Sequence, residues 1–202
     1  MADTANVANL NRVRSADGGF TMIEVLVALG LVTTLMASLG TYFVSSMQVS
    51  RYQAQVQTAV RLAQAGMEMA RGYGGPTLLA GRAACTASTC TDFTPYDTQG
   101  YLRNMARWDA RGSGTLSVPL PAGTGETIPP VNGISYYRYY FVGKCWKSLT
   151  GSTCINDSTL PVAMVRLVVG VAWMESGCPY DMCIRAATAL FSAAPNDPVF
   201  EP

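Results

Sequence analysis

The sequence predicts an α+β protein in which one long N-terminal helix packs on an antiparallel β-sheet. Two observations carry this prediction. Residues 20–71 form an apolar and then amphipathic stretch without proline, and Val-rich and aromatic runs follow after residue 133. Gly, Pro, Ser and Thr become frequent after Gly74. We therefore expect a helical N-terminal part and a globular, β-rich part at 74–202.

The composition of the 202-residue chain limits the classes of protein to consider. Charged residues make up only 13%, against about 25% in ordinary soluble domains, and hydrophobic residues make up 49%. This imbalance indicates that part of the chain lies in lipid or in an assembly. The net charge of +1 provides no field that attracts nucleic acid, and no nucleic-acid partner is expected.

The N-terminal segment has the features of a targeting and membrane-spanning signal. Met1–Gly19 is polar and carries Arg12 and Arg14, and the apolar run Phe20–Val44 follows. This run is long enough to cross a bilayer core of about 30 Å as a helix. Arginines before the run predict a cytoplasmic N-terminus and export of everything after Val44. Glu24 is the only charge in the run.

The helix is predicted to continue beyond the apolar run. Ser45–Arg71 contains no proline and one glycine, Gly66, and we expect an amphipathic continuation at 45–73 that ends at the "GYGGP" of 72–76. The helix would be about 50 residues, or about 75 Å, long. Its predicted apolar face holds Val49, Tyr52, Val56, Ala59 or Val60, Ala63, Met67 and Ala70. Its predicted polar face holds Arg51, Gln55, Arg61, Gln64 and Glu68.

Three long runs in the second part predict strands. They are Gly133–Trp146, Pro161–Met174 and Met182–Ala193, and they would form an antiparallel sheet against the apolar face of the helix. A helix remains an alternative for Met182–Ala193, because alanines are frequent there. Gly114–Leu120 is a weaker strand candidate.

Six cysteines fall in three close pairs, Cys85/Cys90, Cys145/Cys154 and Cys178/Cys183. Fifteen connectivities are open, and pairing of nearest neighbours is the simplest. Each such disulfide would stabilise the fold by roughly 2 kcal/mol, because the loops are short. The spacings do not match the C-x₂-C pattern of zinc sites, so no metal is expected.

Enzymatic chemistry has little support in the sequence. Histidine is absent, so a Ser-His-Asp arrangement cannot form, and no cofactor motif is present. The run Tyr136–Phe141 could be an aromatic binding stripe, but a strand that is half core and half surface is favoured. The run Arg103–Arg111 could contact phosphates, but a solvated loop or short helix is favoured.

The stretch "GGFTMIEVLVALGLV" resembles the type IV prepilin N-terminus, which is shared by type IV pilins and type II secretion pseudopilins. The resemblance covers about the first third of the chain and implies a type IV pilin-like fold without enzymatic activity. It also implies that residues 1–19 are a leader peptide, which a prepilin peptidase cuts between Gly19 and Phe20. Phe20 would then be N-methylated.

The resemblance also suggests a physical role for Glu24. A carboxylate inside a bilayer costs roughly 2.5–3.5 kcal/mol, so it needs a partner. After cleavage, Phe20 carries a cationic amine, and in a helical filament this amine can meet Glu24 of a neighbouring subunit. The pair would fix the axial register.

The run "IEVLVAL" looks most like the minor pilins of the PilV type and their type II secretion counterpart, GspI. A PilV-type minor pilin helps to prime pilus assembly and sits at the tip. The implied partners are the prepilin peptidase, other minor pilins, the major pilin, often a tip adhesin, and inner-membrane lipid before assembly. A type II secretion pseudopilin, an anchored periplasmic enzyme and a DNA-uptake receptor remain alternatives.

Overall fold

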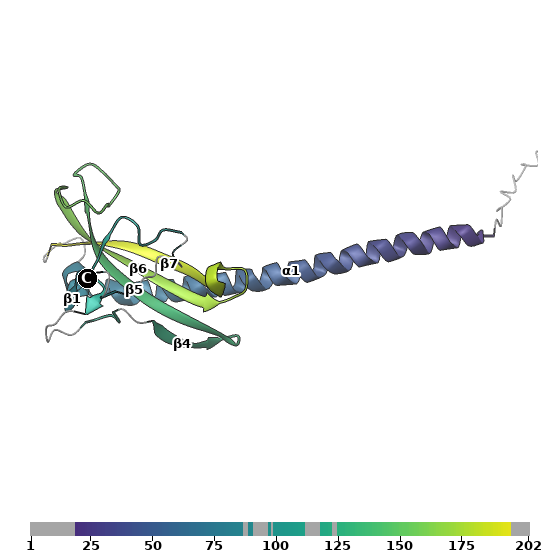
Figure 1. Cartoon of the computed structure of the whole chain (residues 1–202), viewed down its shortest axis with the longest axis horizontal. Helices are drawn as coiled ribbons and strands as arrows, with labels where there is room; N and C mark the ends of the chain where they lie inside the picture. Colours follow the sequence, from purple (N-terminus) through teal and green to yellow (C-terminus); the bar gives the residue numbers. More distant parts are fainter. Residues whose placement is uncertain are drawn as a thin grey trace, which may run out of the picture. The chain divides into compact units, whose positions relative to one another are not determined.

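The computed structural model describes residues 19–86, 89–90, 97, 99–111, 118–122 and 125–194 (Figure 1). The chain divides into two compact units, residues 1–50 and residues 51–202. Its elements in order are α1 (Met22–Arg71), α2 (Gly75–Leu79), β1 (Arg82–Ala83), β2 (Ala106–Arg107), β3 (Ala110–Arg111), β4 (Glu126–Val131), β5 (Ile134–Lys147), β6 (Val162–Met174), the 3₁₀ helix η1 (Pro179–Asp181) and β7 (Met182–Ser192).

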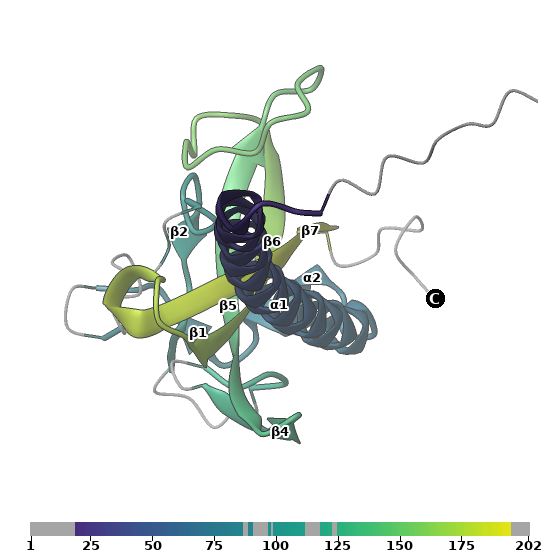
Figure 2. The same ribbon diagram turned by 90° about the vertical axis from the view of Figure 1, so that its right-hand side faces the viewer.

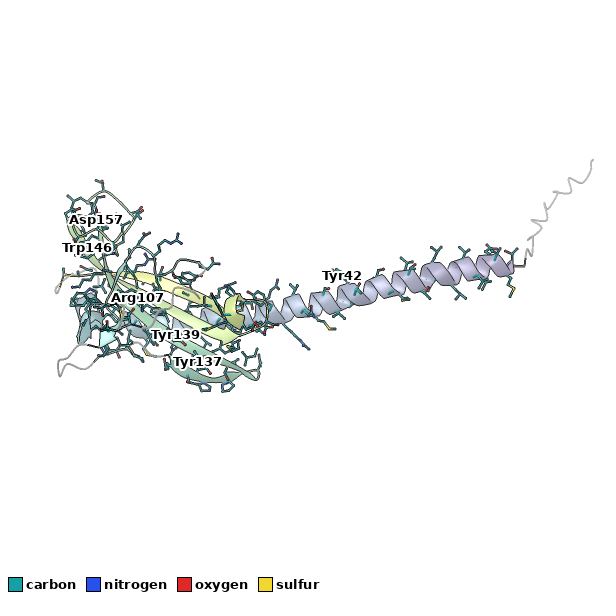
Figure 3. All side chains as sticks on the ribbon, viewed as in Figure 1. Tyr42, Arg107, Tyr137, Tyr139, Trp146 and Asp157 are labelled. Carbon is teal, nitrogen blue, oxygen red and sulfur yellow. A yellow bond between two sulfur atoms is a disulfide. The ribbon has the colours of Figure 1, made fainter. Side chains whose placement is uncertain are left out.

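The predicted long N-terminal helix is confirmed, and α1 contains 50 residues. Every residue of its first part, 22–50, is exposed within the described chain. Tyr42, for example, projects from the ribbon into open space (Figure 3). By length and composition this is the one described helix that could cross a membrane. An apolar surface of this extent indicates burial in lipid or against other chains.

The sheet of the second unit is antiparallel, as predicted. Strands β5, β6 and β7 lie side by side, with Tyr140 opposite Val169 and Val169 opposite Ala187. These strands correspond to the three long predicted runs, so the helical alternative for Met182–Ala193 is wrong. Strands β2 and β4 both pair with the other side of β5, and β1 pairs separately with β3.

The second part of α1 packs on one face of this sheet through small side chains. Ala59, Ala63, Gly66, Met67 and Ala70 are buried. A Cβ atom on Gly66 would lie 2.8 Å from Cδ of Arg138 and 2.9 Å from Cγ1 of Val169. Glycine is therefore needed here for close approach of helix and sheet. The short helix α2 follows and lies beside β7 (Figure 2).

A polar link also ties α1 to the sheet, and it corrects the predicted position of Gln55. The buried Trp173 donates its indole N–H to Oε1 of Gln55 at 3.0 Å. Nε2 of Gln55 donates to Oε2 of Glu175 at 2.8 Å. Gln55 is half-buried toward the sheet, not on the polar face, because a buried indole N–H needs an acceptor.

Strand β4 was not predicted, and a tight turn brings it onto β5. Asn132 and Gly133 both have positive φ, 52° and 79°, as in a two-residue type I′ hairpin turn. The pairing register shifts between Ile128 and Val131, where Pro129 and Pro130 intervene. Glu126 holds the start of β4 through an ion pair with the buried Arg138, at 2.7 Å.

The run Tyr136–Phe141 contributes to both faces of the sheet. Tyr136 and Tyr140 are buried in the core beneath α1, whereas Phe141 joins a second cluster on the opposite face. Tyr137 is 37% exposed. The predicted strand therefore has its core face beneath α1, as expected. Its other face, predicted to be surface, is only partly exposed.

The weaker strand candidate, Gly114–Leu120, is not supported where it can be examined. Residues 114–117 lie outside the described part of the chain, and Val118–Leu120 has no strand conformation. Leu120 is nevertheless buried in the core, and its carbonyl oxygen accepts a hydrogen bond from Nη2 of Arg82 at 3.0 Å. Leu120 therefore contributes its apolar side chain to the core, although its backbone does not pair in a sheet.

We predict that Gly66→Leu lowers the free energy of unfolding of the second unit by about 1 kcal/mol. Overpacking a core costs about 1–3 kcal/mol, and the better helix propensity of leucine returns only about 1 kcal/mol. Urea unfolding of the full chain in detergent measures the change. Gly40→Leu is the matched control, because nothing lies within 4 Å of a Cβ atom at Gly40. Equal stability of the two variants would contradict the packing described here.

Candidate processing and assembly site

The start of α1 is fixed by a local cap. Thr21 precedes the helix, and its carbonyl oxygen accepts hydrogen bonds from the backbone N–H groups of Glu24, at 3.0 Å, and Val25, at 3.2 Å. Its hydroxyl oxygen also accepts from the N–H of Glu24, at 3.3 Å. Threonine is a preferred N-cap residue because its side chain satisfies a free N–H of the first turn. Gly19 and Phe20 stand exposed before this cap.

Glu24 occupies a position in the first turn that favours an acid on local grounds alone. It lies three residues after Thr21, the spacing of a capping box, near the positive end of the helix dipole. Such a position contributes about 0.3–1 kcal/mol at an exposed site. This local term is smaller than the cost of placing a carboxylate in a bilayer, so capping alone does not explain the residue.

Phe20 and Glu24 lie on the same side of the helix. Together with apolar residues they line one shallow groove on its surface, with Val25, Ala28, Leu29 and Val32 as the other lining residues. The carboxylate is thus the one ionisable group on that apolar surface. A cationic group at Phe20 would lie on the same surface.

A family model for the prokaryotic N-terminal methylation motif matches residues 14–40. Gly19, Phe20 and Glu24 all lie within the match. No curated protein and no solved structure matches the chain. The motif and the fold together support a type IV pilin or pseudopilin, which is a structural class of protein rather than an enzyme. The motif implies processing by a prepilin peptidase and assembly with other pilins, and the apolar helix fits an inner-membrane anchor.

The structure contains three local disulfides. Cys85–Cys90, Cys145–Cys154 and Cys178–Cys183 have Cα–Cα distances of 5.4, 5.4 and 5.2 Å. The second lies in the core on the sheet face opposite α1, where Trp146 also pairs with Ile155. The third ties the start of β7 to the turn before it. Each bond therefore holds a loop to the sheet or to a neighbouring strand.

The sulfur atoms of Cys85 and Cys90 and the carboxylate of Asp109 lie within 4.8 Å of one another. Metal binding by cysteine requires thiolates, and here the two sulfurs are joined. In this oxidised form the group offers a metal only one carboxylate. It therefore acts as a structural cluster.

Asp109 is the centre of a buried charge network, which corrects the interpretation of Arg103–Arg111 as a solvated loop or short helix. One carboxylate oxygen accepts from the N–H of Val142 at 2.6 Å, and the other accepts from Nε of Arg107 at 2.8 Å. Nη1 of the buried Arg82 lies 3.6 Å from Oδ1. Residues of this run also form β2 and β3. Arg107 and Asp109 therefore form ion pairs within the protein.

Burial sets the electrostatics of this network. Desolvation raises the pKa of Asp109, although the hydrogen bond and charge of Arg107, the N–H of Val142 and the charge of Arg82 act in the opposite direction. Desolvation likewise lowers the pKa of Arg82. Ionised Asp109 is thus costly to bury and is tolerated because both guanidinium groups accompany it.

A cleft of about 410 Å³ separates α1 from the β4–β5 turn. Its lining includes Arg51, Gln55, Thr58, Asn132 and Tyr136. Burial raises the pKa of Tyr136, so the phenol stays protonated near neutral pH. An arginine and a neutral phenol provide no general acid–base pair at this cleft.

We predict that Asp109→Asn lowers the free energy of unfolding by about 3–5 kcal/mol, since it leaves the buried guanidinium group of Arg82 without the counter-charge of Asp109. Urea unfolding of the full chain in detergent measures the loss. Asp157→Asn is the control, because Asp157 lies outside the core and the side-chain oxygen of asparagine can still accept the two hydrogen bonds from Thr159. A loss no larger than that of the control would show that the network is not needed for folding.

Proposed function

We propose that the chain is a minor pilin of the PilV type, which is incorporated into a type IV pilus and helps to prime its assembly at the tip. The observation that carries this proposal is the methylation motif at residues 14–40 on a helix whose apolar surface is uncovered over residues 22–50. The disulfide-stapled domain, with its long β-sheet, would be the part displayed outside the membrane.

In this proposal the chain has four functional parts. Residues 1–19 are the leader, 20–44 span the inner membrane and later enter the filament core, 45–73 hold the continuation of the helix, which ends at Arg71, and 74–202 form the exported domain. The N-terminus faces the cytoplasm before cleavage. The prepilin peptidase cuts after Gly19, and the amine of Phe20 becomes N-methylated.

The assembly step follows from the cost of the charges. The amine of Phe20 and the carboxylate of Glu24 are each costly in an apolar environment, and pairing across neighbouring subunits relieves both costs. The pair is possible only at one axial offset between two helices. It therefore provides register as well as stability, and the neighbours would be other minor pilins and the major pilin. A tip adhesin would then bind the complex from outside.

A type II secretion pseudopilin is the second candidate. The run "IEVLVAL" resembles GspI as well as PilV, and the methylation motif serves both classes. The long domain with three disulfides favours the pilus. The neighbouring genes separate the two: fimbrial minor-pilin genes support the pilus, and general secretion genes support the pseudopilus.

We predict that Gly19→Glu blocks processing. A peptidase needs an extended, unhindered backbone at the cut, which glycine provides and a glutamate side chain obstructs. Immunoblots of membranes should show the full-length precursor only, and none of it in sheared filaments. Gly30→Ala is the control, because Gly30 lies in open space on α1 and should leave processing unchanged. Normal cleavage of Gly19→Glu would refute the assigned cut.

We predict that Glu24→Ala and Glu24→Gln are processed and anchored normally but fall at least about tenfold in filament association. Breaking a buried pair costs roughly 3–5 kcal/mol, which would allow a larger loss. The measurement is co-purification with sheared filaments, normalised to the membrane level. Glu24→Asp keeps the charge and should retain part of the association.

The glutamine variant separates the two roles of Glu24. Glutamine can replace glutamate in a capping box, but it carries no charge. If Glu24→Gln associates with filaments like the wild type while Glu24→Ala does not, the residue acts as a local cap. If both associate normally, the proposed register pair is wrong.

A further inference from the structure

Strand β7 forms one edge of the sheet and is paired only on one side. Within the described chain its backbone partner is β6, along the whole register from Met164/Ser192 to Met174/Met182. In an antiparallel strand, alternate residues direct their N–H and C=O groups away from the neighbour. About half of the backbone groups of β7 therefore point outward and need water or a partner.

The opposite side of the sheet is protected against further pairing. Strand β4 contains Pro129 and Pro130, which have no N–H group to donate, and its register shifts at the same place. Strand β2, which also pairs with that side of β5, contains only two residues. Prolines, irregular register and short strands are the usual means by which sheet edges avoid adding a strand.

Strand β7 lacks these protective features before Phe191 and Ser192, where α2 lies against it. It has 11 residues without proline, and Ala186–Leu190 carries no charge. The one charged residue, Arg185, is engaged by its own chain: Nη1 donates to the carbonyl of Ile184 at 2.8 Å and Nη2 to the hydroxyl of Tyr52 at 3.3 Å. Thr188 is exposed, and the neighbouring alanines have short side chains, so another polypeptide backbone can approach the strand closely.

We propose that the outer edge of β7, residues 185–190, accepts an extended strand from a different subunit that carries the same kind of N-terminal segment. A row of alternating backbone donors and acceptors is complemented by another polypeptide backbone, and not by a lipid or a nucleic acid. The donated segment must be free of proline and uncharged where it faces Ala186–Leu190. This inference rests on the proposed function, since it adds a specific contact to the assembly.

The geometry favours a different subunit over a second copy of this chain. Antiparallel pairing of two β7 edges is symmetric about an axis perpendicular to the sheet. Residues 51–71 of α1 lie along the sheet face, so the two copies of this segment would run in opposite directions. Subunits that are anchored by their N-terminal helices in one membrane share one direction. The prolines of β4 also prevent that strand from serving as the donor.

The test places a lysine on each edge of the sheet. Thr188→Lys adds a charge to the open edge of β7, and Thr127→Lys is the matched control on β4, where an exposed threonine lies on the blocked edge. We expect Thr188→Lys to reduce co-purification with sheared filaments about tenfold, because a lysine must be desolvated to admit the strand. Thr127→Lys should match the wild type, and both variants should keep the wild-type Tm.

A photo-crosslinker identifies the occupant. p-Benzoylphenylalanine is placed at position 188, and at position 127 as control, in the full chain in producing cells. We expect an adduct at 188 only, with the crosslinked peptide in a proline-free segment of another chain that carries the methylation motif. Wild-type filament association of Thr188→Lys, or adducts at 188 with a second copy or with lipid only, would overturn the proposal.

The two proposals fail in different ways. If the wild-type chain is absent from filaments, the proposed function fails. The crosslink at position 188 is then read in the membrane fraction, where an adduct to another subunit with the motif still supports the edge contact and its absence rejects it.

Discussion

The apolar surface of α1 is the constraint on which the rest of the structure depends. Residues 22–50 are exposed throughout and carry one charge, Glu24, in the first turn of the helix. Such a surface is stable only in lipid or among other apolar helices. A single carboxylate in that environment requires a counter-charge, and cleavage after Gly19 would create one at Phe20. In the proposed function, anchoring, processing and assembly would all depend on this one segment.

The second unit includes the last part of α1, residues 51–71, which packs against the sheet. Small residues on α1, with Gly66 at the closest approach, bring the helix against the sheet, and the link from Gln55 to Trp173 adds a directional contact. The buried carboxylate of Asp109 ties the segment after β2 to Val142 of β5, and the Cys145–Cys154 disulfide holds a loop on the face opposite α1.

Much of this architecture could be predicted from the sequence, because it depends on local patterns. The periodicity of residues 45–71 and the Val-rich run of β6 determine their elements directly. Strand β4 was missed because Pro129 and Pro130 argue against a strand, and only pairing with β5 compensates. Asp109 looked solvated because its partner Arg82 lies far away in the sequence. Gln55 was assigned to the wrong face for the same reason: the requirement comes from the distant Trp173.

The most direct test of the account is the intact mass of the chain recovered from sheared filaments. The account predicts a mass that lacks residues 1–19, carries one additional methyl group on the amine of Phe20, and is reduced by six hydrogens for three disulfides. Fragmentation should place the methyl group on that first residue. Recovery of the chain in filaments with residues 1–19 still attached, or with an unmodified amine at another residue, would contradict the central claim that this segment is processed for assembly.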